Sequence, residues 1–131
     1  MISLDKNPDS IYFLKENIKL NGVEDIVVVY EGDNRTIANE WIGLCDRVLI
    51  GYLPDAEPFI ERALQFAKPE KAILHYHYIA RKDEFAELPA KHFEEHLRKV
   101  GRKMEILHIE NVKNYAPQLC HYTADILVTS S

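Results

Sequence analysis

Short apolar runs alternate with helical patterns along most of this chain, and that alternation restricts the fold more than any other feature. Strand-like runs cover residues 2–4, 26–30, 47–50 and 71–79. Between them lie segments of about ten residues in which apolar side chains recur every three or four positions. Strands that alternate with helices form β-α-β units, whose strands are parallel. The sequence therefore predicts an α/β fold with a mainly parallel sheet.

The predicted helices have recognisable start and stop residues. Asn7 is a suitable N-cap for the first helix, with Pro8 in its first turn, and Asn21-Gly22 ends it. Further helices are expected at residues 36–44, 58–67 and 90–100. Lys68-Pro69 ends the third of these four helices, and Gly101 ends the last.

The last two predicted strands, residues 104–110 and 124–129, have no helical pattern between them. They are joined by a connection at 111–122, and we expect them to form an antiparallel hairpin. A mainly parallel sheet with an antiparallel C-terminal strand pair is the architecture of class I S-adenosylmethionine-dependent methyltransferases, a Rossmann-like fold. We therefore expect residues 1–131 to form a single partial domain of this class.

The opening run I-S-L-D-K-N-P is a short apolar strand that ends in an acid and is followed by a helix. In nucleotide-binding α/β domains this pattern is typical of the second strand, after a first strand and its glycine-rich turn. We expect that first strand to be missing here. A second polypeptide or self-association would then complete the sheet, unless the strands that end at Asp5 and Gly51 pair directly.

Composition excludes several other classes of protein. The formal net charge of −5 argues against a broad electrostatic nucleic-acid binder, although a local basic patch is compatible with it. There is no apolar run of membrane-spanning length and no signal-peptide pattern, so no membrane partner is expected. Cys45 and Cys120 are interpreted as reduced core thiols of a cytoplasmic protein.

Three predicted strands end in residues that are suited to ligand binding. Asp5 follows the first strand, where a carboxylate can accept hydrogen bonds from both hydroxyls of a ribose. Asp33-Asn34 follow the second, where a carboxylate and an amide can recognise an adenine amino group. Gly51 follows the third and allows a close backbone approach. Each residue alone is also a common turn former or helix cap, so the combination carries the prediction.

Five motifs together resemble one family of archaeal and eukaryotic tRNA-modifying enzymes. They are D-K-N-P, E-G-D-N-R, D-R-V-L-I-G-Y-L-P, H-Y-H-Y and N-Y-A-P, and they occur in the family's order across essentially the whole chain. The family uses S-adenosylmethionine on the purine 3′ of the anticodon. It comprises tRNA guanine-N1 methyltransferases and the aminocarboxypropyltransferases of wybutosine synthesis.

The resemblance implies a role for each matching residue. Asp5 would hold the ribose hydroxyls with Lys6 and Asn7 beside it, and Asp33 and Asn34 would hold the adenine. The segment after the third strand would line the methionine tail and the reacting centre. That segment supplies Gly51, Tyr52 and Leu53 for cofactor binding, with Tyr52 and Pro54 as the predicted catalytic residues.

The segment after the third strand also favours one branch of the family. The methyltransferases have an N-L-P type sequence there, and in this chain Tyr52 occupies the Asn position. This resembles the aminocarboxypropyl branch, which acts on the tricyclic guanosine derivative of tRNA(Phe). The methyltransferase branch is the alternative, and a non-catalytic or partner-dependent remnant is a further one. In either enzyme the pocket around the methionine tail selects which carbon is transferred.

Histidine pairs allow both a structural and a chemical interpretation. His75 and His77 point to the same side of a strand, where they contact RNA, pack on the sheet or share a metal ion. H-F-E-E-H at residues 92–96 matches the inverted zinc-protease motif, but no third ligand is evident. We therefore predict no metal site and treat a metal hydrolase as a remote alternative.

Basic and aromatic residues supply the remaining candidates. Arg81 and Lys82 are predicted to contact RNA together with His75 and His77. Four other basic residues form either a phosphate-binding patch or ordinary surface charge: Arg98, Lys99, Arg102 and Lys103. Tyr76 and Tyr78 form either a stacking surface for a flipped base or part of the core.

Overall fold

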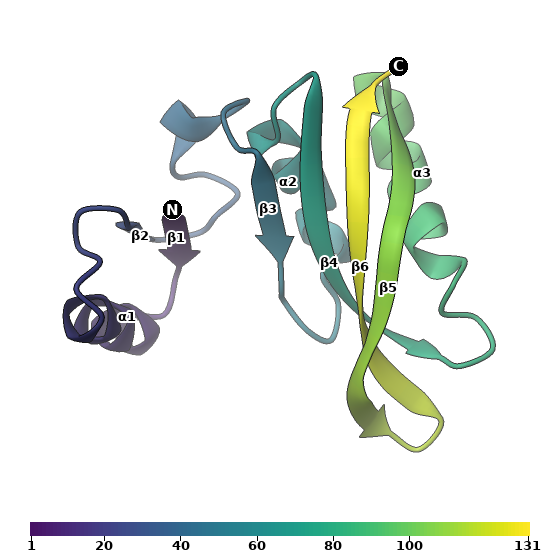
Figure 1. Cartoon of the computed structure of the whole chain (residues 1–131), viewed down its shortest axis with the longest axis horizontal. Coiled ribbons are helices and arrows are strands. Elements are labelled where there is room, and N and C mark those ends of the chain that lie inside the picture. The colour runs from purple at the N-terminus through teal and green to yellow at the C-terminus, as the bar shows by residue number, and fades with distance from the viewer. The chain divides into compact units, whose positions relative to one another are not determined.

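The computed structural model describes the whole chain, from Met1 to Ser131. It divides into two compact units, Met1–Glu40 and Trp41–Ser131, and each is described here by itself. Strands and helices alternate in both units, as the sequence pattern predicts (Figure 1). No helix is both long and apolar enough to cross a lipid bilayer.

The first unit contains β1 (Ile2–Asp5), α1 (Pro8–Leu20) and β2 (Val28–Glu31). The two strands pair in parallel, with Asp5 opposite Glu31. Asn7 caps α1 as predicted, because its side-chain oxygen accepts a hydrogen bond of 2.9 Å from the Asp9 N–H. β2 begins at Val28, two residues later than predicted.

The helix predicted at residues 36–44 is wrong. The segment contains only a single 3₁₀ turn, η1 (Asn39–Trp41). Ala38 has a φ of 62° and Gly43 a φ of 75°, and a right-handed helix cannot continue through either backbone conformation. The apolar residues that imitate a helical period therefore belong to a series of turns.

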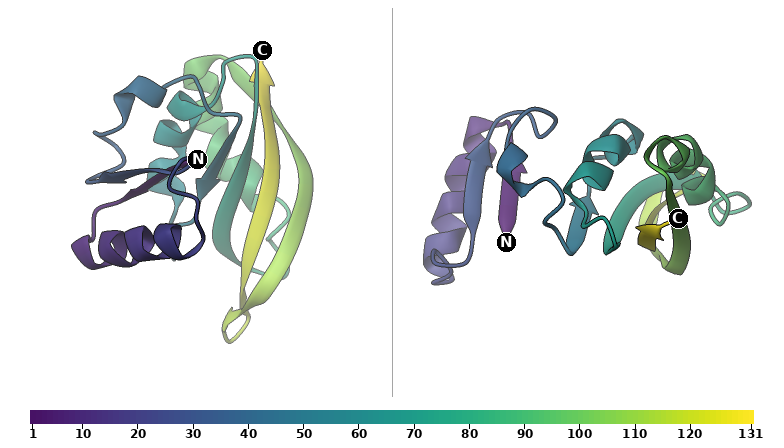
Figure 2. Two further views of the ribbon diagram at one scale, coloured as in Figure 1. Left: turned by 60° about the vertical axis from the view of Figure 1, so that its left-hand side comes forward. Right: turned by 90° about the horizontal axis from the view of Figure 1, so that it is seen from above.

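The second unit is a four-stranded sheet covered on one face by two α-helices (Figures 1 and 2). Its strand order is β3-β4-β6-β5, with β3 and β4 parallel and the other neighbours antiparallel. Its elements are β3 (Arg47–Ile50), η2 (Glu57–Phe59), α2 (Ile60–Phe66), β4 (Lys71–Arg81), α3 (Leu88–Val100), β5 (Arg102–Ala116) and β6 (Leu119–Ser130). Gly101 ends α3 with a left-handed φ of 64°, as its position predicts.

The core of the second unit lies between the sheet and its helices. Burial alternates along β4, where Leu74, Tyr76 and Tyr78 are almost fully buried on the helix side. The Tyr76 ring packs edge-on against Phe93 of α3, at a distance of 5.0 Å between ring centroids. The interpretation of Tyr76 and Tyr78 as core residues is thus confirmed, and their interpretation as a base-stacking surface is wrong.

The C-terminal antiparallel pair is confirmed, but its predicted connection is wrong. Residues 111–122 are almost entirely strand, and only Pro117 and Gln118 separate β5 from β6. The alternation of apolar residues does not show this, because most side chains in the second half of β5 are exposed. Three register shifts between β5 and β6 disturb the alternation further.

Each unit contains a strand with an unpaired edge. Within the first unit β1 pairs only with β2, and within the second unit β3 pairs only with β4. On β3, Leu49 is 71% exposed. The strands of a parallel sheet are normally buried on both faces. The exposed Leu49 therefore indicates that the sheet of the second unit lacks a neighbour at β3.

Leu74 and Leu49 provide a matched test of where the stability of the second unit resides. Leu74 is fully buried and Leu49 is 71% exposed, and both side chains are on strands of one sheet. We expect Leu74→Ala to lower the free energy of unfolding by about 3 kcal/mol, from lost burial plus a cavity. Leu49→Ala should change it by less than about 0.5 kcal/mol.

Urea unfolding followed by circular dichroism measures both variants. Equal losses from the two substitutions would contradict the placement of the core on the helix side of the sheet.

Candidate functional site

Two of the predicted ligand-binding segments lie together in the first unit. The Gly32 N–H donates a hydrogen bond of 2.9 Å to the Asp5 carbonyl oxygen, which joins the ends of β1 and β2. Gly32 has a φ of 147°, and a Cβ added there would lie 3.2 Å from the Ile37 side chain. Asp5 and Asp33 therefore follow the carboxyl ends of adjacent parallel strands, where ligands bind in open α/β sheets.

The Asp5 carboxylate is exposed and retains acceptor capacity. One oxygen, Oδ1, accepts a hydrogen bond of 2.9 Å from the Asn7 N–H, which fixes the orientation of the carboxylate. An ionised carboxylate has about four acceptor positions, so two ribose hydroxyls can still be bound. Asn7 itself uses its side-chain oxygen to cap α1, so only its amide N–H groups are available to a ligand. Lys6 lies beside them in the sequence, at the exposed start of the turn.

Arg35 is a site residue that the sequence reasoning missed. Its Nε and Nη2 donate to the two oxygens of Asp33 at 3.0 and 2.8 Å, and its backbone N–H adds a third hydrogen bond at 2.9 Å. The hydrogen bonds from the Arg35 side chain are the main reason why the pKa of Asp33 falls to about 2. The D-N-R spacing is the signal, since an Arg two residues after an Asp can close such a turn.

The third predicted segment follows β3 in the second unit. A Cβ added to Gly51 would lie 3.9 Å from the ring of His77, so the backbone passes close to that side chain. Tyr52 is 60% exposed, and its ring centroid lies 5.2 Å from that of Phe59. The Leu53–Pro54 peptide is cis. Tyr52 thus presents an aromatic face and a hydroxyl to solvent directly after the strand end.

His75 lies on the sheet face opposite the helices and is held from two sides. Its Nδ1 lies 2.7 Å from Oδ1 of Asp125, and its Nε2 lies 3.1 Å from Nη1 of Arg47. A guanidinium only donates hydrogen bonds, so Nε2 is the acceptor and Nδ1 carries the proton that Asp125 accepts. This network fixes the neutral tautomer and the ring orientation of His75.

His77 forms a second pair on the same face. Nδ1 of His77 lies 2.9 Å from Nε2 of His121 and 3.4 Å from the hydroxyl oxygen of Thr123. Burial lowers the pKa of His77, and the neighbouring histidines His121 and His75 lower it further. The pKa of His121 is lowered by burial and by Lys113. The neutral pair shares one hydrogen bond, and protonation of both rings would destroy it.

The helix motif at residues 92–96 does not form a metal centre. Nδ1 of His92 lies 2.9 Å from the hydroxyl of the core residue Tyr76, and Glu95 lies 3.8 Å from Lys99. No group of three or more His, Cys, Asp or Glu side chains is arranged to hold a metal ion.

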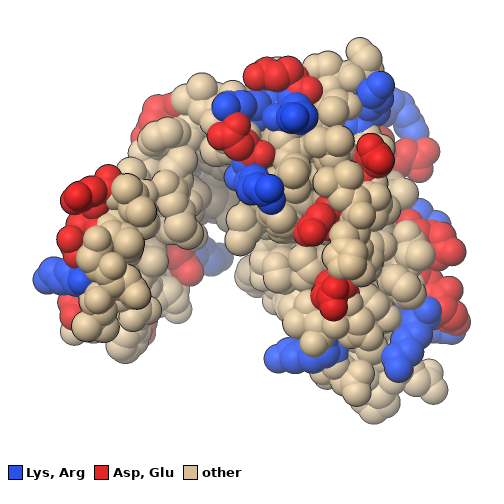
Figure 3. Space-filling model, in the orientation of Figure 1, with Lys and Arg blue, Asp and Glu red and all other residues tan.

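The predicted basic residues do not form one patch. Arg98 and Lys99 pair with Glu94 and Glu95 one helical turn earlier. Arg102 donates to main-chain carbonyl groups, at 2.6 Å for that of Lys68, and so has a structural role. Figure 3 shows acidic and basic side chains mixed over the visible face. Arg81 and Lys82, at the carboxyl end of β4, are separate from these three.

Comparison with known proteins places this geometry in context. The family model described as the TRM5/TYW2 methyltransferase domain matches residues 1–107. A tRNA(Phe) (4-demethylwyosine(37)-C(7)) aminocarboxypropyltransferase of Pyrococcus horikoshii is 36% identical over 131 residues, which is 100% of this chain and 46% of that protein. The crystal structure of P. horikoshii TYW2 in complex with MeSAdo superposes with a TM-score of 0.90, and covers 99% of this chain and 48% of that one.

Two further structures extend the comparison. M. jannaschii TYW2 in complex with AdoMet has a TM-score of 0.90 and 28% identity, over 99% of this chain and 57% of that one. Trm5b from Pyrococcus abyssi has a TM-score of 0.84 and 31% identity, over 98% of this chain and 37% of that one. The chain thus spans about half the length of the P. horikoshii relative, and the class I methyltransferase-like fold is confirmed.

Removal of the Arg35 guanidinium should release the Asp33 carboxylate. We expect Arg35→Gln to raise the pKa of Asp33 from about 2 toward the ordinary value of 3.8, because the hydrogen bonds that favour the ionised form are lost. NMR titration of the side-chain carboxyl carbon measures this shift. Arg98→Gln, which changes a helix ion pair in the second unit, is the control and should leave Asp33 unchanged.

The His77–His121 pair should make stability depend on pH. The pKa values of both groups are lower in the folded state than the ordinary value of 6.5. Their contribution is therefore complete above about pH 6.5 and is lost as the pH falls toward the folded-state values. We expect His77→Gln to reduce the loss of unfolding free energy between about pH 7.5 and pH 5.5. Urea unfolding at each pH measures this, and an unchanged slope would contradict it.

Proposed function

Because the chain belongs to the TRM5/TYW2 methyltransferase family, we propose that it is the cofactor-binding part of an S-adenosylmethionine-dependent tRNA aminocarboxypropyltransferase. The substrate is the tricyclic guanosine derivative 3′ of the anticodon in tRNA(Phe), within wybutosine synthesis. The 36% identity with the P. horikoshii enzyme over the entire chain is the observation that carries this proposal. Cytoplasmic location is part of the same proposal.

The residues of the first unit fit the adenosine part of the cofactor. Asp5 has an ionisable carboxylate with free acceptor positions, as a ribose diol requires. Asp33 is held ionised by Arg35, and with about four acceptor positions on the carboxylate it can still accept from an adenine amino group. Lys6, Asn7 and Asn34 complete this proposed adenosine subsite.

The residues of the second unit fit the methionine tail and the reacting carbon. Gly51 leaves the backbone accessible, and Leu53 offers an apolar contact beyond it. Tyr52 and Pro54 are the proposed catalytic residues, which orient the tail. S-adenosylmethionine supplies a sulfonium centre whose neighbouring carbons are electrophilic. Which carbon reacts depends on how these side chains hold the tail, so the reaction depends on positioning and not on a dedicated base.

Methyl transfer to guanine-N1 is the second candidate function. Trm5b of P. abyssi shares 31% identity and the same fold, and the matching family model covers both branches. Tyr52 at the position of the methyltransferase Asn favours the aminocarboxypropyl branch. tRNA incubated with cofactor labelled in the methyl group or in the carboxyl group distinguishes the two reactions.

The unpaired edges of β1 and β3 support a further part of the proposal. In this proposal, a second polypeptide or a second copy of the chain pairs with these edges. The P. horikoshii relative is about twice as long as this chain, so catalysis is proposed for the completed assembly.

Calorimetric titration with S-adenosylmethionine tests the central claim. We expect binding that Asp33→Ala weakens at least about tenfold, the loss that follows from removing a charged hydrogen-bond partner. Asp9→Ala is the matched control, since Asp9 is an exposed acid in the first turn of α1. Equal binding by all three proteins, or no binding by the folded wild-type chain, would contradict the proposed adenosine subsite.

A further inference from the structure

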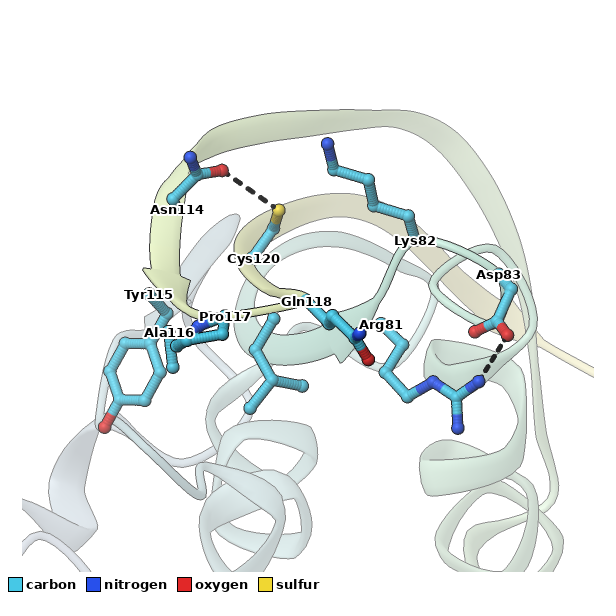
Figure 4. Close-up of a pocket in the computed structure, with 10 residues that line it drawn as sticks. Arg81, Lys82, Asp83, Asn114, Tyr115, Ala116, Pro117, Gln118 and Cys120 are labelled. Carbon is cyan, nitrogen blue, oxygen red and sulfur yellow. Dashed lines mark hydrogen bonds and ion pairs between the residues drawn. The ribbon is translucent and has the colours of Figure 1, made fainter.

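The second unit contains a pocket of about 630 Å³ between the β5–β6 turn and the segment that follows β4 (Figure 4). Its volume is within the range of small-molecule sites, about 300–1,000 Å³. It is lined by Arg81, Lys82, Asp83, Leu119, Cys120 and residues 114–118. The residues named above for cofactor binding and catalysis are not among them.

The pocket lies at the edge of the sheet that holds the carboxyl ends of the parallel strands, but it is separate from the segment after β3. β3 and β4 are parallel, so Gly51 and Arg81 both follow carboxyl strand ends. Ile50 is opposite Tyr76, and β4 continues from there to Arg81, about 16 Å further at 3.3 Å per residue. A ligand in the pocket would therefore lie to one side of the proposed reacting centre, which is at the segment after β3.

Polar groups in the pocket are oriented by the fold. The Cys120 thiol, buried in the floor, donates to Oδ1 of Asn114 at 3.4 Å, which leaves the Asn114 amide N–H groups free to donate. Gln118 has a φ of 63°, a conformation that L residues adopt rarely and that fixes how the turn presents its side chain. A register shift between Asn114 and Ala116 re-aims this end of β5.

The charge of the pocket favours an anion. Arg81 pairs with Asp83 at 2.5 Å, whereas Lys82 has no ion-pair partner. The pocket therefore carries a net positive charge in a chain whose net charge is −5. Figure 4 shows the Lys82 and Asn114 side chains extending to one side of the strands and those of Arg81 and Tyr115 to the other. On the first side, the free Lys82 cation lies with the Asn114 amide, and a cation beside amide donors can bind the phosphate and the base edge of single-stranded RNA.

We propose that this pocket binds one nucleotide of the RNA substrate that flanks the modified base. Lys82 contacts its phosphate, and the amide of Asn114 donates at the base edge. This inference rests on the proposed function, because it assigns a distal subsite for the same RNA. It predicts effects on RNA affinity and none on cofactor affinity.

Fluorescence anisotropy with a labelled RNA stem–loop, using the full chain, tests the proposal. We expect Lys82→Ala to weaken RNA binding about tenfold. It should also reduce the slope of log affinity against log salt concentration by about one, the share of one phosphate contact. Lys71→Ala is the matched control, since Lys71 is exposed at the other end of the same strand. Asn114→Asp should weaken binding more than Asn114→Ala, because it adds a negative charge.

Each outcome separates the two proposals. Loss of RNA affinity in Lys82→Ala with unchanged S-adenosylmethionine binding supports the pocket, whether or not Asp33→Ala affects the cofactor. Equal effects of Lys82→Ala and Lys71→Ala, or no RNA binding by the wild-type chain, would overturn it. Competition by pyrophosphate as strong as that by a nucleoside monophosphate would reduce the site to an anion site and overturn the nucleotide assignment.

Discussion

The second unit depends on one interaction, the antiparallel pairing of β4 with β6 over the whole length of β4. This ladder fixes which side chains of β4 face α3 and which face the opposite side. Tyr76 is thereby buried against Phe93, while His75 meets Asp125 and His77 meets His121. Gly51 passes beside His77, and Arg81 ends the strand at the pocket, so these candidate groups take their positions from β4.

Local sequence signals predicted much of the fold because they act through neighbouring residues. Asn7 caps α1 with its own side chain, and Gly101 ends α3 because a left-handed residue is needed there. The failures occurred where apolar periodicity is not set by a buried face. Residues 36–44 imitate a helix until Ala38 interrupts it, and the exposed half of β5 resembles a loop in composition although it is strand.

The candidate site shows the same division. Asp5 and Asp33 were predicted from their positions after strands, and the Gly32–Asp5 hydrogen bond brings these strand ends together. Arg35 was missed, because its role is to hold a neighbouring carboxylate ionised and not to mark a strand end. The pairs of His75 with Asp125 and of His77 with His121 were also out of reach, since the two members of each pair lie more than forty residues apart in the sequence. Long-range pairing of this kind follows from the register of the sheet, which a single sequence does not specify.

The short turn at Pro117-Gln118 also bears on how the second unit folds. β5 and β6 are adjacent in sequence, so their hairpin closes with little loss of chain entropy. β4 instead joins β6 only after α3 and β5 have been enclosed in the loop between them, and contacts of such high sequence separation form slowly. We expect the hairpin to form early and the docking of β4 onto it to limit the folding rate. The strand that positions most candidate groups would then be among the last to find its place.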